Sequence, residues 1–131
     1  GFFKTIFYRI SFANIFCVAA ALALSSIVLQ IVYGTADPNI ESVYLVLVSG
    51  CFVTIPSMLM GYPFLAAMGH PHYTNWTIVI TSIVHITGLF ILYLCSALDT
   101  TTVAMMVVFS ESLLICFRAA GIRRFHLFKT K

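Results

Sequence analysis

The chain has 131 residues, of which 61% are hydrophobic and 8% are charged, and its formal net charge is +3. Soluble globular domains carry about 25% charged residues, so this composition excludes that class and predicts a membrane protein. The chain opens with Gly1 and not with methionine, and we therefore expect a fragment or a processed chain.

Four apolar runs are long enough for transmembrane helices, which need about 20 apolar residues to cross the bilayer. They are predicted near residues 11–33, 43–68, 77–97 and 102–122. We therefore expect an all-α polytopic membrane protein, with residues 1–131 forming one membrane segment. Because the connections are short, sequential helices should be antiparallel neighbours.

The charged residues predict the orientation of these spans. All seven basic residues lie before the first span or at the end of the fourth span and beyond it. Loops 34–42 and 98–101 contain Asp37, Glu41 and Asp99 and no base. Because Lys and Arg near span ends are retained in the cytoplasm, we predict that both termini are cytoplasmic and that these two loops lie outside.

The hairpin MGYPFLAAMGHPHYTNW, residues 60–76, is then cytoplasmic. Its glycines and prolines predict a tight turn that can act as a hinge between two helices. We expect Tyr73 and Trp76 in the aromatic belt at the membrane surface, and His70 and His72 among wetted headgroups.

Both ends of the chain alternate aromatic and basic residues, in the runs GFFKTIFYRI and RRFHLFKTK. This pattern is typical of interfacial segments beside anionic lipid. Asn14 and Gln30, near the two ends of the first span, are also expected at the membrane interfaces.

No pattern in the chain indicates enzyme chemistry. The four cysteines lie in apolar runs without the spacing of a metal site or a disulfide framework, and are expected to be packing residues. There is no phosphate-binding glycine loop, no metal-binding His/Glu spacing and no nucleophile with its base. We expect no catalytic residue, metal, cofactor or nucleic-acid partner.

Ionisable side chains inside a span are costly and need a partner or a wet cavity. Glu111 lies near the middle of the fourth span and His85 at a similar depth in the third, so a proton-sharing pair is geometrically possible. The alternative for each is a buried polar group bonded to a hydroxyl or a carbonyl. For Glu111 we favour function, because a midplane carboxylate is costly; for His85 we favour packing.

Arg118 lies on nearly the same face of the fourth span as Glu111, nearer to the cytoplasm. Two interpretations remain open. Its side chain either points into a cavity and attracts an anionic headgroup, or extends to the membrane interface.

Two spans carry faces of small or polar residues. Pro56 and Pro63 interrupt the second span and free backbone carbonyls, which suits a bent helix that lines a pathway. Close helix packing explains its small residues equally simply and is favoured. The face in the second span consists of Gly50, Thr54, Ser57 and Gly61, and the face in the third, which should look inward, of Thr77, Thr81, His85 and Gly88.

Residues 61–94, GYPFLAAMGHPHYTNWTIVITSIVHITGLFILYL, resemble the penultimate hairpin of bacterial polysaccharide-biosynthesis flippases, the lipid-linked O-antigen translocases. The most specific part is YPFLAAMGHPHYTN, and the four-span pattern extends the likeness over nearly all of the chain. The resemblance implies the multidrug, oligosaccharidyl-lipid and polysaccharide exporter superfamily. The chain would then be the last four spans of a two-lobed exporter of about twelve helices.

The resemblance also implies a cargo and partners. The family moves undecaprenyl-diphosphate-linked oligosaccharide across the bacterial inner membrane by alternating access, with a cation gradient as a proposed energy source. The partners would be this substrate, membrane lipids, the missing N-terminal helices and other polysaccharide assembly proteins. Arg118 is the base placed to meet the diphosphate, and Glu111 is the candidate for coupling-ion exchange.

Two further functions compete with this one. A small four-span drug/proton antiporter has this length and one membrane carboxylate, but places that carboxylate in its first span, where this chain has none. A non-transporting membrane assembly subunit would tolerate Glu111→Gln, whereas changes on the small faces of its first two spans would destroy assembly.

Overall fold

The computed structural model describes residues 2–34 and 37–125, and in these ranges every regular element is a helix. The elements are α1 (Phe2–Ala23), α2 (Ser25–Tyr33), α3 (Pro38–Met60), the π-helix η1 (Gly61–Ala66), α4 (Pro71–Leu94) and α5 (Thr100–Arg124). Four stretches are long and apolar enough to cross a membrane: Phe3–Ala23, Pro38–Ala66, Pro71–Leu94 and Thr100–Arg124. The predicted all-α polytopic membrane fold is confirmed.

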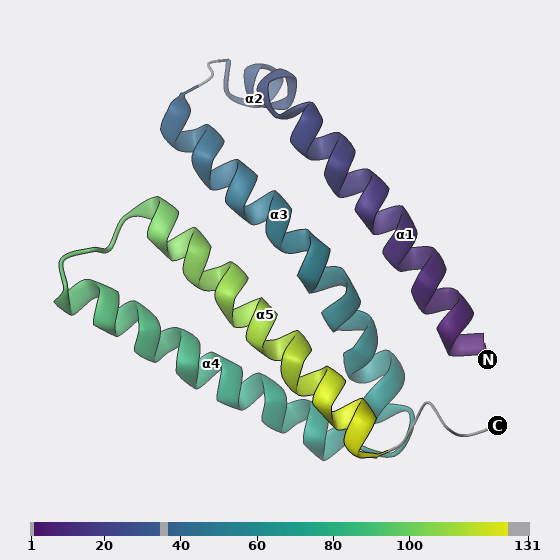
Figure 1. Cartoon of the computed structure of the whole chain (residues 1–131). Coiled ribbons are helices and arrows are strands. Elements are labelled where there is room, and N and C mark those ends of the chain that lie inside the picture. Colours follow the sequence, from purple (N-terminus) through teal and green to yellow (C-terminus); the bar gives the residue numbers. More distant parts are fainter. Residues whose placement is uncertain (1, 35–36, 126–131) are drawn as a thin grey trace.

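The four long helices form a single layer in the order α1, α3, α5, α4 (Figure 1). The contacts of α1 with α3 and of α4 with α5 agree with the expected antiparallel neighbours. The second and third spans are neighbours only near their hairpin, where η1 contacts α4; beyond it α3 and α4 diverge and α5 lies between them.

The small-residue face of α3 explains why α5 takes this place. A Cβ at Gly50 would lie 2.8 Å from Cγ2 of Val108 on α5, so the two backbones approach closely there. Ser57 and Gly61 lie against Arg118 of the same helix. Small residues allow such close approach in membrane helices, and these contacts agree with the packing interpretation of this face.

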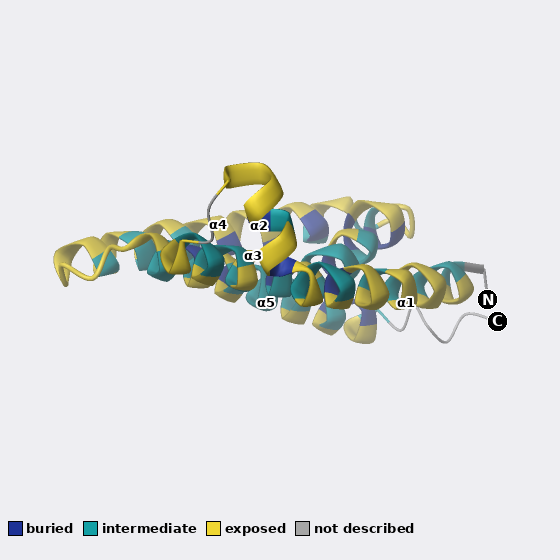
Figure 2. Ribbon diagram, turned by 90° about the horizontal axis from the view of Figure 1, so that it is seen from above, coloured by how far each residue is buried: buried dark blue, intermediate teal, exposed yellow. Residues whose placement is uncertain are grey.

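The first span differs from its prediction. Its helix begins at Phe2 rather than near residue 11, and it is broken at Leu24, after which α2 turns out of the layer (Figure 2). The break precedes the pair Ser25 and Ser26, and serine pairs are a recognised cause of helix kinks.

The N-terminal aromatic run is therefore part of α1 and not a separate interfacial segment. Phe3 stacks on Phe64 of η1, with ring centroids 3.9 Å apart. Asn14 lies within the apolar stretch of α1, and its amide donates to the carbonyl of Cys51 on α3 at 3.0 Å. The prediction that Asn14 lies at the membrane interface is therefore corrected. Residues 126–131, most of the second end segment, lie outside the described residues.

The layer is thin, and many of its apolar side chains are exposed on its two faces (Figure 2). All four cysteines are exposed, so they do not pack within this chain as expected. Buried hydrophobic residues are few: Val18, Leu29, Phe64, Leu65, Ala104 and Ile122. In a membrane the exposed faces meet lipid or other helices.

The prolines act differently from the prediction. Helix α3 continues through Pro56, which removes one N–H donor without ending the helix. Pro63 instead lies in η1, where the wider π-helical turn accommodates a residue that cannot donate to the preceding turn. The predicted tight turn follows, with Gly69 at φ +90° and Pro71 in the first turn of α4.

Tyr73 connects α4 to α5 and is not confined to an aromatic belt. Its hydroxyl donates to the carbonyl of Phe117 at 2.7 Å. Its ring lies against Gly121, where any Cβ would collide with it, and edge-on to Phe125, whose ring also stacks on His70 at 3.8 Å. Trp76, in contrast, is exposed.

Gly121→Ala should destabilise this contact by about 1–3 kcal/mol, because the new methyl group displaces the Tyr73 ring and weakens its hydrogen bond. Gly88→Ala is the matched control, because its methyl group meets only the flexible end of Met106 and should cost less than about 1 kcal/mol. Thermal unfolding in detergent measures both variants, and equal losses would contradict the packing described for Tyr73.

Candidate functional site

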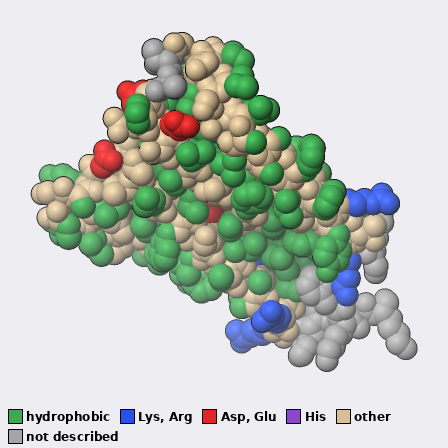
Figure 3. All heavy atoms as spheres, turned by 45° about the horizontal axis from the view of Figure 1, so that its top comes forward, with side chains coloured by type: hydrophobic (Ala, Val, Ile, Leu, Met, Phe, Trp, Pro, Cys, Tyr) green, Lys and Arg blue, Asp and Glu red, His purple; other side chains and the backbone are tan. Residues whose placement is uncertain are grey.

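Apart from Glu111 and Arg118, the charges of the described residues lie at the two ends of the layer, with an apolar belt between them (Figure 3). The start of α1 carries Lys4 and Arg9, and the end of α5 carries Arg123 and Arg124. The acidic residues Asp37, Glu41 and Asp99 cap or begin α3 and α5 at the opposite end. This separation is what the positive-inside rule requires of an even number of spans.

A cavity of about 480 Å³, open to the surface of the layer, lies between α4 and α5 within the apolar belt. It brings together three of the residues singled out in the sequence, Thr81, His85 and Glu111. The remaining lining residues are Ile78, Ser82, Ile86, Val107, Ser110 and Leu114. The face of α4 that carries Thr77, Thr81, His85 and Gly88 therefore looks inward, toward α5, as predicted.

His85 is half-buried and joins the two helices through a side-chain hydrogen bond. Its Nδ1 lies 2.8 Å from Oγ of Ser110 on α5. The Ser110 hydroxyl also lies 2.8 Å from the carbonyl oxygen of Met106, one turn earlier on its own helix. This agrees with the packing interpretation of His85, because the imidazole is bonded to a hydroxyl.

Glu111 follows Ser110 directly and is half-buried in the same cavity. Its carboxylate makes no hydrogen bond to another residue in the described ranges. Its charge interacts with that of Arg118, two turns further along α5. A carboxylate at this depth with its oxygens unpaired can accept a proton or another cation from the cavity.

Arg118 takes neither of the two positions considered from the sequence. Its side chain is 5% exposed and is directed at α3, away from both a cavity and the membrane surface. Nη1 donates to the carbonyl and the hydroxyl of Ser57, at 2.6 Å and 3.2 Å. Gly61 leaves room for the guanidinium, whose Nε has no partner among the described residues.

The other predicted pathway residues lie in the packing around these sites. The Thr54 hydroxyl donates to the carbonyl of Gly50 at 3.2 Å within α3, and the Thr81 hydroxyl donates to the carbonyl of Thr77 at 2.7 Å within α4. Pro63 lines an apolar cavity beside α1. Only Thr81 of this group shares a cavity with Glu111.

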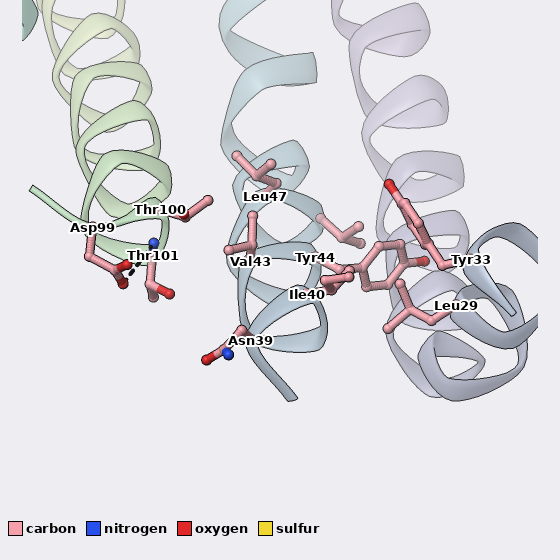
Figure 4. A pocket seen from close by; sticks show the side chains of 11 residues that line it. Leu29, Tyr33, Asn39, Ile40, Val43, Tyr44, Leu47, Asp99, Thr100 and Thr101 are labelled. Atoms are coloured by element: carbon pink, nitrogen blue, oxygen red, sulfur yellow. Dashed lines mark hydrogen bonds between the residues drawn. The ribbon is translucent and has the colours of Figure 1, made fainter. Parts of the chain in front are cut away.

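A further cavity of about 330 Å³ lies at the acidic end and was not expected from the sequence (Figure 4). Tyr33 and Leu29 lie on one side of α3, and Asp99 and Thr101 on the other. The Asp99 carboxylate accepts the Thr101 N–H at 3.3 Å and caps α5. This carboxylate therefore has a structural task, and the cavity is the weaker candidate.

The chain has no match among protein-family models, curated proteins or solved structures.

The contact between Gly61 and Arg118 predicts a coupling that a double-mutant cycle can measure. A Cβ at position 61 would lie 2.8 Å from Cζ of Arg118, so Gly61→Ala should cost about 1–3 kcal/mol alone. In the Arg118→Ala background the methyl group has room, so the two effects should deviate from additivity by about 0.5–3 kcal/mol.

The control cycle combines Gly61→Ala with Arg123→Ala, because Arg123 is exposed on the same helix. Its two effects should add within about 0.5 kcal/mol. Unfolding in detergent gives all the values, and additive effects in the Arg118 cycle would show that the guanidinium does not occupy this position.

Proposed function

We propose that this chain is part of a flippase that translocates undecaprenyl-diphosphate-linked O-antigen or related repeat units across the bacterial inner membrane. The resemblance of residues 61–94 supports the cargo. The structural observation that supports transport is the cavity between α4 and α5, where Glu111 and His85 face a common space inside an apolar belt. Ionisable residues that face a common space at this depth are a feature of transport pathways.

Glu111 is the residue that carries ion coupling in this proposal. Its carboxylate lies in a cavity and has no hydrogen bond to a described residue, so it can bind and release a cation without first breaking a protein contact. A bound cation changes the charge between α4 and α5 and thereby the relative stability of two arrangements of these helices. Such a difference is what alternating access requires.

The cytoplasmic hairpin supplies the movable element of the proposed cycle. The π-helix η1 lies between α3 and the turn to α4, and π-helical turns often occur at functional sites. Arg118 holds α3 against α5 just before η1, through its bonds to Ser57. Arg118 can meet the cargo diphosphate only after these bonds open, so this role belongs to another state of the cycle.

An assembly function is the second candidate, because the layer is thin and exposes large apolar side chains. A partner protein could cover these faces in place of the remaining helices of an exporter. The two functions differ in what they require of Glu111: transport depends on its ionisation, whereas assembly depends on the packing faces alone.

The test is complementation of a strain that lacks its own O-antigen flippase, with the protein that contains this chain. Glu111→Gln should lower surface polysaccharide about tenfold or more at unchanged membrane protein level, because the amide cannot exchange a cation. Glu41→Gln, at the acidic end of α3, is the matched control and should restore normal polysaccharide.

Two results would contradict the proposal. If the unmutated protein is expressed but restores no polysaccharide, the cargo is wrong. If Glu111→Gln restores polysaccharide fully, transport stands and the coupling role of Glu111 is wrong.

A further inference from the structure

The contacts of Ser110 determine where the hydrogens lie between α4 and α5. The serine hydroxyl has a single hydrogen, yet Oγ is 2.8 Å from both Nδ1 of His85 and the carbonyl oxygen of Met106. A carbonyl oxygen can only accept. The Ser110 hydroxyl must therefore donate its hydrogen to the Met106 carbonyl. The hydrogen in the other contact must then come from Nδ1 of His85, which donates to Oγ of Ser110.

This arrangement fixes the tautomer of His85. A neutral imidazole carries one N–H, so with Nδ1 protonated the basic atom is Nε2. Protonation at Nε2 then produces the imidazolium without disturbing the bond to Ser110. Such a bond to one ring nitrogen is the usual way in which a protein sets the function of the other.

We propose that Ser110 is a positioning residue that holds His85 in the Nδ1–H form, so that Nε2 is the atom of His85 that binds an exchangeable proton in the cavity that Glu111 also lines. With the proton on Nε2 the ring is the imidazolium, and after release it is the neutral imidazole. That this proton is the coupling ion rests on the proposed transport function.

The surroundings favour a proton over a metal cation. Hard cations take six or more oxygen ligands, whereas the cavity offers one carboxylate, an imidazole and three hydroxyl residues, Thr81, Ser82 and Ser110. The described residues contain no group of three or more His, Cys, Asp or Glu side chains able to hold a metal ion.

No other titratable side chain lines the cavity. Its lining residues all come from α4 and α5, and His85 and Glu111 are the two among them that titrate. Helix α3, which also packs against α5, contributes none of them. Arg118 interacts with Glu111 along α5, but its guanidinium is held on the α3 side by Ser57.

The tautomer can be tested by nitrogen NMR of histidine-labelled protein in lipid bilayers, with His85→Gln used to assign the signals. Neutral His85 should be the Nδ1–H form. Ser110→Ala should lower the ratio of Nδ1–H to Nε2–H about three- to tenfold, which is the effect of one ordinary hydrogen bond. Ser110→Thr keeps the hydroxyl and should keep the ratio.

Ser112→Ala is the matched control. The Ser112 hydroxyl donates to the carbonyl of Val108 at 2.8 Å, as Ser110 does to Met106, but it has no histidine partner. This variant should leave the His85 signals unchanged. An Nε2–H form in the unmutated protein, or a ratio that Ser110→Ala does not move, would overturn the positioning role.

The proton itself is tested in the same samples and in the complemented strain. Sodium at constant pH should leave the His85 signals unchanged, and a sodium-dependent change in these signals would overturn the proton site. If the spectra are as expected but Glu111→Gln restores surface polysaccharide, the proton site stands and its proton is not the coupling ion. If the spectra are as expected but the unmutated protein restores no polysaccharide, the transport function fails and the proton site stands.

Discussion

The structure depends on the close contact between α3 and α5. Gly50 and Gly61 remove the side chains that would otherwise separate the two helices, and Arg118 fills the space beside Gly61 and binds the Ser57 carbonyl. A buried guanidinium needs acceptors, and here a backbone carbonyl and a hydroxyl serve. This contact places α5 between α3 and α4, and so creates the cavity on its other side.

The sequence predicted the helices well and their neighbours only in part. The membrane alone sets the length of each apolar run and the positions of the charged residues at its ends. The similar depths of His85 and Glu111 in their spans were enough to suggest that they share a site. The sequence shows which residues share a helix face, but not which neighbouring helix that face meets. The direction of Arg118 and the separation of α3 from α4 therefore had to come from the structure.

Two local features were missed for different reasons. The break at Leu24 precedes Ser25 and Ser26, a local signal that hydropathy averaged over the span does not register. Ser110 looked like any helical serine, since most bond to a carbonyl of the preceding turn. It became a site residue only through the position of His85 on another helix.

The order of helices in the layer also has a consequence for biosynthesis. Helix α5 is the last described helix to be made, yet it lies between two helices made before it. Until it enters, the α3 face around Gly50 and Ser57 has no partner from α5. The central pair therefore forms late and by a contact distant in sequence, which slows assembly. During this interval the nascent protein exposes a helix face suited to wrong partners, and would benefit from a chaperone within the membrane.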